Sequence, residues 1–419
     1  MISPPRPGRR VLLITNIPTP YRIPLFNELN AQLAALGIAF KVVFAALGYP
    51  RRKWEIDTKT FSFPWEVLNS SRFSAHNPES AMFTYSGLGR ILRGEQGSLV
   101  IVAGFSLATT RVWLRSVFRR TSYLIWSGAI ERKGSPDSWI QRWRRRLLVA
   151  RARGFIAYGS RARDYLISLG APPHAVSIGI NTVDTIYFQK ETARLRSEAG
   201  LSESGLKRIL YVGNLEQGKR LDHLLNAIQA LSRFRNDFVL DLVGSGSQES
   251  YLKQLAERLG IAGCVQFHGY RQRPDVVSHL AHAYCFAFPS EYDVWGLVLV
   301  EAMAAELPCV SSVHAGATDD LIRNGVTGFA LDFENTAAVA SRLSWLLDHP
   351  TESRSVGHAA QRFIQEDASI QKSAAGFVAG INAALARESE GDRGRPAVAG
   401  SVSTISREHV ASEPSRGKL

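Results

Sequence analysis

Short apolar strands alternate with amphipathic helices along most of this chain, and this alternation limits its possible folds more than any other feature. In the first half the strand-like runs are RVLLIT (10–15), FKVVFAAL (40–47), SLVIVAG (98–104), SYLIWSG (122–128), RGFIAYGS (153–160) and AVSIGIN (175–181). The pattern restarts with RILYVGN at 208–214 and continues to PCVSS at 308–312. Parallel sheets covered by helices on both faces have this pattern. The sequence therefore predicts an α/β fold with two doubly wound, Rossmann-like domains.

The chain length and the gaps between these runs predict the domain boundaries. A chain of 419 residues is too long for one compact core and fits two domains. We expect an N-terminal domain at 1–190, a linker at 191–205 and a C-terminal domain at 206–370. A helix at 371–388 is expected to pack back on the N-terminal domain. The Gly-, Ser- and Arg-rich end at 389–419 is expected to be disordered, because it has few large apolar groups to bury.

The cysteines and the apolar runs indicate a cytoplasmic protein. Cys264, Cys285 and Cys309 lie in or beside apolar runs and are interpreted as buried free thiols in a reducing compartment. The VLLI run near the start is too short for the core of a signal peptide. No run approaches 18 uninterrupted apolar residues, so no membrane-spanning helix is expected.

Positive charge is concentrated in the first half. The formal net charge of the chain is +13, yet residues 1–190 alone hold 27 Lys and Arg against 10 Asp and Glu. This asymmetry indicates that the first half meets an anionic partner, such as nucleic acid, a lipid surface or a phosphorylated substrate. No nucleic-acid-binding motif accompanies the charge, so nucleic acid is not expected as a partner.

One basic segment, SWIQRWRRRLLVARARG at 138–154, has helical periodicity. Trp139, Trp143 and Leu147 fall on one stripe of such a helix. An adjacent face carries four arginines: Arg142, Arg145, Arg146 and Arg153. The helix either contacts anionic lipid headgroups on the inner face of the plasma membrane or turns its tryptophans toward the core, and the sequence leaves both open.

The segment AFPSEYDVWGLVLVEAMAAELP at 287–308 carries the strongest chemical signal. A strand ends near Pro289, a loop carries Glu291 and Asp293, and a helix beginning near Gly296 places Glu301 in its first turns. The free N–H groups at a helix start favour an anion, whereas carboxylates accept hydrogen bonds from hydroxyls. Together they suit a ligand with both phosphate and sugar. Alternatively, Asp293 caps the helix and Glu301 interacts with its dipole.

A second signal is RILYVGNLEQGKRLDHLL at 208–225. A strand leads into a Gly-containing turn, and Lys219 precedes a helix. A lysine there can reach a diphosphate leaving group, although many such lysines are simply solvated. The sequence contains no P-loop, no Asp-x-Asp, and no further ligands spaced to join His279 and His282. Neither a metal nor a cofactor is therefore expected.

These segments resemble the retaining glycosyltransferases of family 4. The segment PSEYDVWGLVLVEAMAAELP is similar to the family signature, in which seven residues separate two glutamates. YVGNLEQGKRLDHLL resembles the start of the family's second domain, and similar segments follow in the family order up to HAGATDDLIRNGVTGFAL. The resemblance covers roughly residues 10–385. It implies the GT-B fold, with a nucleotide-sugar donor in the second domain, an acceptor in the first and a cleft between them.

The resemblance also implies roles for individual residues. Asp293, Lys219 and Glu301 form the implied catalytic set, with Lys219 on the diphosphate and Glu301 on the donor ribose. The implied donor-binding residues are Gly213, Asn214, Lys219, Arg220, Gly269, Tyr270, Arg271, Gly296, Leu297, Val298 and Glu301. The implied acceptor side consists of Tyr21, Arg22, Trp126 and Ser127.

The chain departs from the family pattern at several of these positions. Asp293 replaces a longer Glu, and Asn214 stands where the family has a diphosphate-binding Arg, a role for which Arg220, Arg22 or Arg271 is a candidate. Glu306 occupies a position that is usually Gly. The first domain has TPYRIP in place of a Gly-Gly loop, and Trp126 and Ser127 stand where a His is common.

The sequence as a whole predicts a metal-independent, retaining transferase on the cytoplasmic side of the membrane. It would transfer sugar from a nucleotide-diphosphate sugar to a saccharide or lipid-linked acceptor, in the synthesis of bacterial-type surface polysaccharide or glycoconjugate. Two alternatives stay open. One is a nucleotide-sugar 2-epimerase of the same architecture, and the other is a non-catalytic module that binds a nucleotide sugar or nucleic acid.

Overall fold

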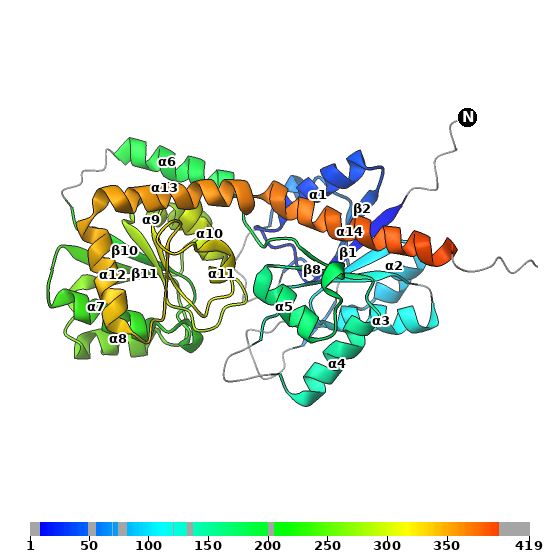
Figure 1. Cartoon of the computed structure of the whole chain (residues 1–419), viewed down its shortest axis with the longest axis horizontal. Helices are drawn as coiled ribbons and strands as arrows, with labels where there is room; N and C mark the ends of the chain where they lie inside the picture. Colours follow the sequence, from blue (N-terminus) through cyan, green and yellow to red (C-terminus); the bar gives the residue numbers. More distant parts are fainter. Residues whose placement is uncertain are drawn as a thin grey trace, which may run out of the picture.

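The chain forms two lobes that lie side by side, each built around its own sheet (Figure 1). The computed structural model describes residues 9–48, 56–68, 70–73, 82–119, 121–131, 137–199 and 205–393. Both large sheets are parallel throughout. The two doubly wound α/β domains expected from the sequence are therefore confirmed.

The first domain contains a seven-stranded sheet in the order β3-β2-β1-β6-β7-β8-β9. Its strands are β1 (Arg10–Thr15), β2 (Ala39–Phe44), β3 (Trp65–Val67), β6 (Leu99–Ala103), β7 (Tyr123–Ser127), β8 (Gly154–Ala157) and β9 (Val176–Ile178). A separate antiparallel pair is formed by β4 (Arg72–Phe73) and β5 (Met82–Phe83). From β1 the chain adds β2 and β3 on one side of the sheet, and from β6 it adds β7, β8 and β9 on the other side. Strands β1 and β6 therefore mark the switch point, where open α/β sheets bind ligands.

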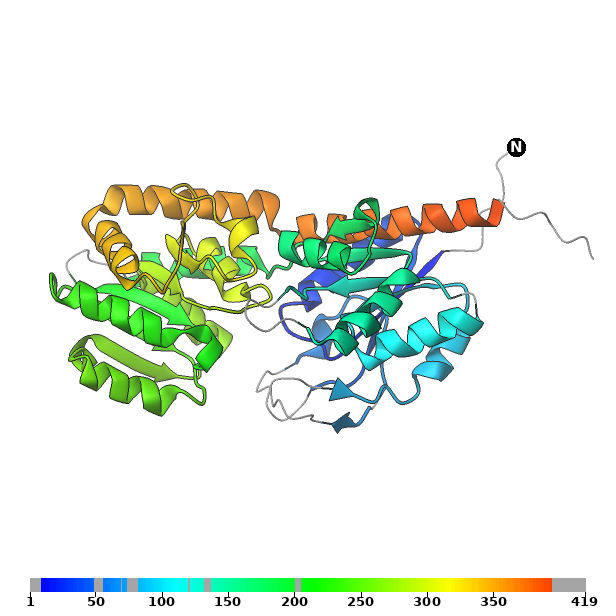
Figure 2. The same ribbon diagram turned by 60° about the horizontal axis from the view of Figure 1, so that its bottom comes forward.

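Helices cover both faces of this sheet, as Figure 2 shows from a second side. They are α1 (Ile23–Ala35), α2 (Leu88–Gly94), α3 (Leu107–Phe118), α4 (Trp139–Ala150), α5 (Ser160–Ser168) and the distant α14 (Ile370–Arg393). One core cluster joins the sheet to α1 and α14, and another joins it to α2, α3, α4 and α5. The short strand β3 and the helix α2 were not expected from the sequence, because each has too few apolar residues to show a period.

The second domain has a six-stranded sheet in the order β12-β11-β10-β13-β14-β15. Its strands are β10 (Lys207–Val212), β11 (Phe238–Val243), β12 (Val265–Gly269), β13 (Cys285–Phe288), β14 (Cys309–Ser312) and β15 (Phe329–Leu331). Its helices are α6 (Thr185–Ala199), α7 (Leu221–Ser232), α8 (Glu249–Arg258), α9 (Arg273–His282), α10 (Leu297–Ala304), α11 (Thr318–Leu321), α12 (Thr336–Asp348) and α13 (Pro350–Asp367). Helices α7, α8 and α12 neighbour one another, as do α6, α9, α10 and α13. All three cysteines are free thiols.

The segment expected to be a linker is largely helical. Residues 191–199 belong to α6, while 200–204 lie outside the described residues. Phe188 is buried in the core of the second domain, Leu195 packs against that core, and Thr192 lies buried between them in sequence. Their spacing of three and four residues is helical. The polar Thr192 interrupts the apolar stripe of this helix, so the sequence did not show the helical period. The hydroxyl of Thr192 is satisfied by the carbonyl of Phe188 at 2.7 Å.

Two successive helices, α13 and α14, carry the chain from the second domain back to the first. Helix α13 packs against α10, whereas α14 packs against α1, β8 and β9 (Figure 1). Phe377 and Ile381 of α14 are buried in the first core. A disordered tail was expected at 389–419, but residues 389–393 belong to α14. Residues 394–419 lie outside the described residues. Within the described residues, no helix is both long and apolar enough to span a bilayer.

The two domains also touch where α5 begins. Asp320 of α11 accepts hydrogen bonds from the amide of Ser160 at 3.0 Å and from its hydroxyl at 2.9 Å. Arg161 donates two bonds to Asp319, at 2.6 and 2.8 Å. Gly159 lies so close to Trp295 that an added Cβ would be 2.2 Å from the indole ring. The carboxylate of Asp320 thus takes the capping place at the amino end of a helix in the other domain.

Replacing Asp320 should weaken this contact. Asp320→Ala leaves the first amide of α5 without its acceptor, and we expect the free energy of unfolding to fall by about 1–2 kcal/mol. Urea titration measures the change, with Glu334→Ala as the control because Glu334 is exposed. An Asp320→Ala protein as stable as the wild type would show that the cap does not stabilise the fold.

Candidate functional site

Glycine-containing loops line the carboxyl edge of the second sheet. Gly213 follows β10, and its amide donates to the carbonyl of Val243 at 2.9 Å. Gly244 follows β11 and donates in the same way to Gly269, also at 2.9 Å. An added Cβ on Gly244 would be 1.8 Å from the carbonyl oxygen of Gly213. Two of the predicted donor-binding residues, Gly213 and Gly269, are therefore joined through a third glycine along one edge.

Lys219 and Asp293 form an ion pair at this edge. Lys219 ends the short 3-10 turn Gln217–Lys219, and its Nζ lies 2.5 Å from Oδ2 of Asp293. The side chains remain 22% and 19% exposed, so a ligand can reach both. Two of the three predicted catalytic residues are thus in direct contact. An anionic ligand at Lys219 would compete with Asp293 and release its carboxylate for other hydrogen bonds.

Helix α10 begins beside this pair. Gly296 precedes the helix at a φ of +97°, and no side chain caps the first turn. The amide of Trp295 donates to Oδ1 of Asp293 at 3.2 Å, which fixes the loop before the helix. Leu297 and Val298 occupy the first turn, where backbone N–H groups lack helical partners. The predicted backbone donors Leu297 and Val298 therefore follow Asp293 closely in the chain, and Asp293 in turn contacts Lys219.

Glu301 lies in the second turn of α10. Burial raises the pKa of its carboxyl group to about 7, and the nearby positive charge of Arg273 opposes this rise. The residue keeps some exposed surface. No described residue forms a hydrogen bond or ion pair with its side chain. A buried carboxyl group whose pKa is raised and which has no partner among the described residues is typical of a ligand-binding site.

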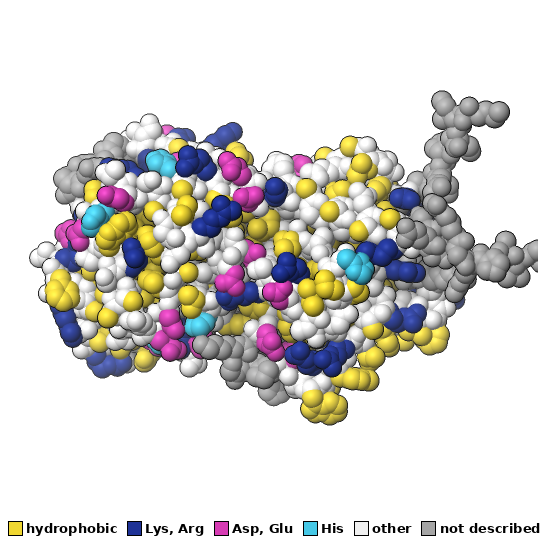
Figure 3. Space-filling view, in the orientation of Figure 1, with side chains coloured by type: hydrophobic (Ala, Val, Ile, Leu, Met, Phe, Trp, Pro, Cys, Tyr) yellow, Lys and Arg dark blue, Asp and Glu magenta, His cyan; other side chains and the backbone are white. Residues whose placement is uncertain are grey.

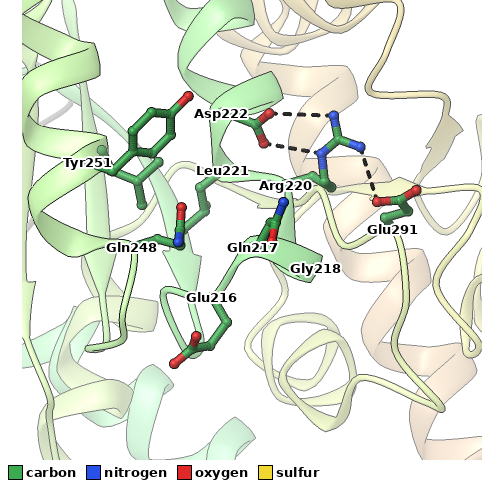
Figure 4. A pocket seen from close by; sticks show the side chains of 10 residues that line it. Glu216, Gln217, Gly218, Arg220, Leu221, Asp222, Gln248, Tyr251 and Glu291 are labelled. Atoms are coloured by element: carbon green, nitrogen blue, oxygen red, sulfur yellow. Dashed lines mark hydrogen bonds and ion pairs between the residues drawn. The ribbon is translucent and has the colours of Figure 1, made fainter.

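Arg220 and Glu291 belong to a neighbouring cavity of about 670 Å³ (Figure 4). Nη1 of Arg220 lies 3.1 Å from Oε2 of Glu291, and Nε lies 3.2 Å from Oδ1 of Asp222. The cavity is also lined by Gln248 and Tyr251 of the α8 region, but not by Lys219, Asp293 or Glu301. The guanidinium of Arg220 is already neutralised by two carboxylates. A diphosphate at Arg220 would have to compete with both carboxylates.

The remaining predicted donor residues lie on exposed loops. Asn214 is exposed after β10, and its backbone carbonyl accepts a hydrogen bond from the hydroxyl of Tyr211 at 2.9 Å. Tyr270 and Arg271 are exposed after β12. These residues follow strands of the same parallel sheet, so they lie at the same edge as Lys219.

The predicted acceptor residues surround one arginine at the carboxyl edge of the first sheet. Arg22 lies at the start of α1, and its guanidinium carbon is 4.5 Å from the ring centre of Trp126 and 5.7 Å from that of Tyr21. Trp126 and Ser127 are only 1% and 2% exposed. Their side chains are therefore enclosed in this conformation, and their placement on the acceptor side stays a prediction. They are the last two residues of the apolar strand β7, and the Arg22 guanidinium lies over the ring of Trp126.

The sequence did not reveal Tyr158, Gly159 or Trp295 as part of this region. Tyr158 packs against the core clusters of both domains, and Gly159 contacts the ring of Trp295. The only local signal is the Gly-Ser pair after β8, which is typical of a strand that turns into a helix. The contact itself joins residues more than a hundred positions apart, which no local pattern reports.

Within the described residues, no group of three or more His, Cys, Asp or Glu side chains is placed to hold a metal ion. His279, considered in the sequence, lies 4.5 Å from His268, ring centre to ring centre. His268 in turn contacts Asp241 at 2.7 Å and belongs to the packing of the second sheet.

The raised pKa of Glu301 predicts a pH-dependent loss of stability. Below pH 4.5 the carboxyl is protonated in both states and has no effect. Between its ordinary pKa and about 7, the unfolded chain ionises while the folded protein keeps its proton, so stability falls as pH rises. Glu301→Gln should therefore be about 1–3 kcal/mol more stable than the wild type at pH 8, with little difference at pH 4.5. Urea titrations at both pH values measure this.

The exposed Glu257 provides the control, since Glu257→Gln should not change the pH dependence of unfolding. An equal effect of Glu301→Gln at both pH values would contradict the raised pKa.

Comparison with known proteins links the second domain to sugar transfer. Residues 195–363 match the family model of the glycosyl transferases group 1. Over 242 residues the chain is 26% identical to glycogen synthase from Mycobacterium tuberculosis, covering 58% of this chain and 55% of that protein. It is 30% identical over 189 residues to N-acetyl-alpha-D-glucosaminyl L-malate synthase from Bacillus anthracis, covering 45% and 48%. The chain thus spans about half the length of these relatives.

The whole architecture has known counterparts as well. The crystal structure of HepE from Anabaena in complex with UDP superimposes with a TM-score of 0.68 and 18% identity, covering 89% of this chain and 99% of that one. At this identity the likeness concerns the fold alone. Together with the two parallel-sheet domains, it confirms the GT-B fold expected from the sequence, while the family match is confined to residues 195–363.

Proposed function

We propose that this protein transfers a sugar from a nucleotide-diphosphate sugar to a saccharide or lipid-linked acceptor. The observation that carries the proposal is the pairing of Lys219 with Asp293 just before the uncapped start of α10. These residues lie inside the segment similar to the glycosyl transferases group 1. The presence of UDP in the HepE structure supports a nucleoside diphosphate as the donor's carrier.

The residues of this site suit the charges that develop during transfer. The bond from the sugar C1 to the β-phosphate oxygen breaks, and both of its electrons leave with the diphosphate. The acceptor hydroxyl forms the new bond to C1, and its proton passes to the departing phosphate oxygen. Lys219 and the amides that open α10 would stabilise the added negative charge. Asp293, released from Lys219, would accept a hydrogen bond from the donor sugar, and Glu301 one from the ribose.

We further propose that transfer retains the anomeric configuration, needs no divalent metal and serves the synthesis of a surface polysaccharide or glycoconjugate. The motif resemblance supports retention. The cation and the helix start at one edge support metal independence, because they supply the positive charge that a metal would otherwise provide.

Lys219→Ala should slow transfer more than it weakens donor binding. The ammonium matters most as the diphosphate gains charge, so we expect turnover at saturating donor to fall about 100-fold or more. The assay measures release of nucleoside diphosphate from UDP-glucose, GDP-mannose and ADP-glucose, with and without EDTA. Lys190→Ala is the control, because Lys190 is exposed on α6.

Three outcomes would contradict parts of this proposal. Unchanged turnover in Lys219→Ala would place leaving-group stabilisation elsewhere. Loss of activity in EDTA, restored by magnesium, would overturn metal independence. A 2-epimer of the donor sugar formed without acceptor would favour the isomerase alternative.

We also propose that the first domain binds an anionic membrane surface. The tryptophans of α4 do not face the core: Trp139 is 78% exposed and Trp143 59%. The neighbouring α3 exposes apolar residues too, so the two helices present what we term the α3–α4 apolar surface, formed by Leu114, Val117, Phe118, Trp139, Ile140 and Trp143. Figure 3 shows hydrophobic side chains with basic ones beside them along the lower margin of this domain.

The arginines near this surface differ in their partners. Arg145 pairs with Asp137 at 2.5 Å, and Arg142 pairs with Glu131 at 3.3 Å. Arg119 and Arg146 are exposed and pair with no described residue. The two unpaired arginines are the better candidates for lipid phosphates. Exposed indoles beside guanidinium groups that no described acid neutralises suit an interface between water and lipid.

Trp139→Ser combined with Trp143→Ser should weaken membrane binding. We expect the affinity for vesicles of phosphatidylcholine and phosphatidylglycerol, measured by co-sedimentation, to fall at least about tenfold, because two indoles no longer enter the headgroup layer. Phe234→Ser is the matched control, since Phe234 is an equally exposed aromatic residue in the other domain. Equal binding by all three proteins, or equal binding to pure phosphatidylcholine, would contradict the proposal.

A further inference from the structure

Arg22 is a partly enclosed cation that has no acidic partner in the described part of the chain. Its Nη2 donates to the hydroxyl of Tyr158 at 2.5 Å, and its Nη1 donates to Oγ1 of Thr15 at 3.4 Å. Burial raises the pKa of Tyr158, against the opposing charge of Arg22, so the phenol is neutral at pH 7. No described Asp or Glu pairs with Arg22. Of the three arginines considered for the diphosphate, Arg220 is neutralised by carboxylates and Arg271 is exposed, which leaves Arg22 as the enclosed, unpaired charge.

Three buried polar atoms belong to Arg22 or to residues beside it. They are Nε of Arg22, Nε1 of Trp126, whose ring centre lies 4.5 Å from the guanidinium carbon, and Oγ1 of Thr19, and none forms a hydrogen bond with a described residue. Buried polar groups in native proteins are normally paired, because a buried donor without a partner loses its hydrogen bonds to water and gains none in return. All three atoms can donate a hydrogen bond. An enclosed guanidinium with an unsatisfied N–H and no described acidic partner is typical of a site for an anion.

The position of Arg22 in the fold points to a substrate. It follows β1, which stands at the switch point of the first sheet, and it is the residue at which α1 begins. The first turn of α1 contains no acidic residue, so the helix dipole adds to the positive potential. Arg22 keeps some exposed surface, through which an anion can approach.

A short series of contacts connects Arg22 to the second domain. Its partner Tyr158 precedes Gly159, which contacts Trp295. The amide of Trp295 binds Asp293, and Asp293 binds Lys219. The adjacent Tyr21 packs against the core of the second domain. The unpaired guanidinium of the first domain is thus separated from the Lys219–Asp293 pair by a few contacting residues.

We propose that Arg22 binds a phosphate group of a substrate, with the amino end of α1 assisting. The planar guanidinium can bind two phosphate oxygens at once. The assignment of the phosphate to a substrate rests on the proposed sugar transfer, whereas the site itself does not. The phosphate has two possible sources, the diphosphate of the donor or a phosphate on the acceptor.

Calorimetric titration with inorganic pyrophosphate tests the site directly. We expect Arg22→Gln to bind pyrophosphate at least about tenfold more weakly than the wild type. Arg22→Lys keeps the charge but loses the paired donors, so an intermediate affinity is expected. Arg90→Gln removes a charge from the exposed face of α2 and should bind as the wild type does. Near-ultraviolet circular dichroism checks that each variant is folded.

A second titration, in saturating UDP, distinguishes the two sources. Pyrophosphate that still binds beside UDP, and no longer binds in Arg22→Gln, would assign Arg22 to an acceptor phosphate. Pyrophosphate displaced by UDP, together with weaker UDP binding in Arg22→Gln, would assign it to the donor. Folded Arg22→Gln or Arg22→Lys with wild-type affinity for both ligands would overturn the proposal, as would a wild type that does not bind pyrophosphate at millimolar concentration. Failure of sugar transfer alone would leave these binding results intact.

Discussion

The parallel arrangement of both sheets is the constraint on which the rest of the structure depends. Strands that run in one direction must return through helices, so each sheet is buried on both faces and its loops gather at two edges. The carboxyl edge of the second sheet collects Gly213 and Lys219 from the connection after β10, Gly269 from the end of β12 and Asp293 from the loop after β13. The carboxyl edge of the first sheet collects Arg22 and Tyr158 in the same way. The chemistry follows from this topology rather than from proximity in sequence.

The two edges are electrostatically incomplete in opposite ways. In the second domain Glu301 is a carboxyl group whose burial disfavours ionisation, and Lys219 is held by an acid that a ligand can displace. In the first domain Arg22 is a charge that no described acid neutralises, and its buried Nε forms no hydrogen bond with a described residue. Both arrangements lower the stability of the empty protein, and a ligand with hydroxyls and phosphates would satisfy both. Instability of this kind is expected where side chains are placed for binding rather than for packing.

On the outer surface of the first domain, helix α4 combines exposed tryptophans with arginines that are partly neutralised. Trp139 and Trp143 share a helix with several arginines, yet only part of that charge is free, because Arg142 and Arg145 are bound to neighbouring acids. The neighbouring helix α3 also exposes apolar residues, among them Phe118, which lies outside the segment that the sequence singled out. Counting basic residues along one helix therefore overstates its free charge and understates its apolar area.

The sequence by itself determined the fold class, the two sheets and the segments that carry the donor-site residues. Strand and helix periods, glycines after strands and the acid pair near α10 are local patterns. They involve residues close together in the chain, so the sequence alone shows them. The helix α6 was missed because a threonine, satisfied by a backbone carbonyl, occupies its buried stripe. Only the tertiary structure decided that Trp126 is buried, that Trp139 is exposed, that Arg220 is neutralised and that Arg22 is not. Burial and charge pairing depend on residues that lie far apart in the chain, so no local pattern contains them.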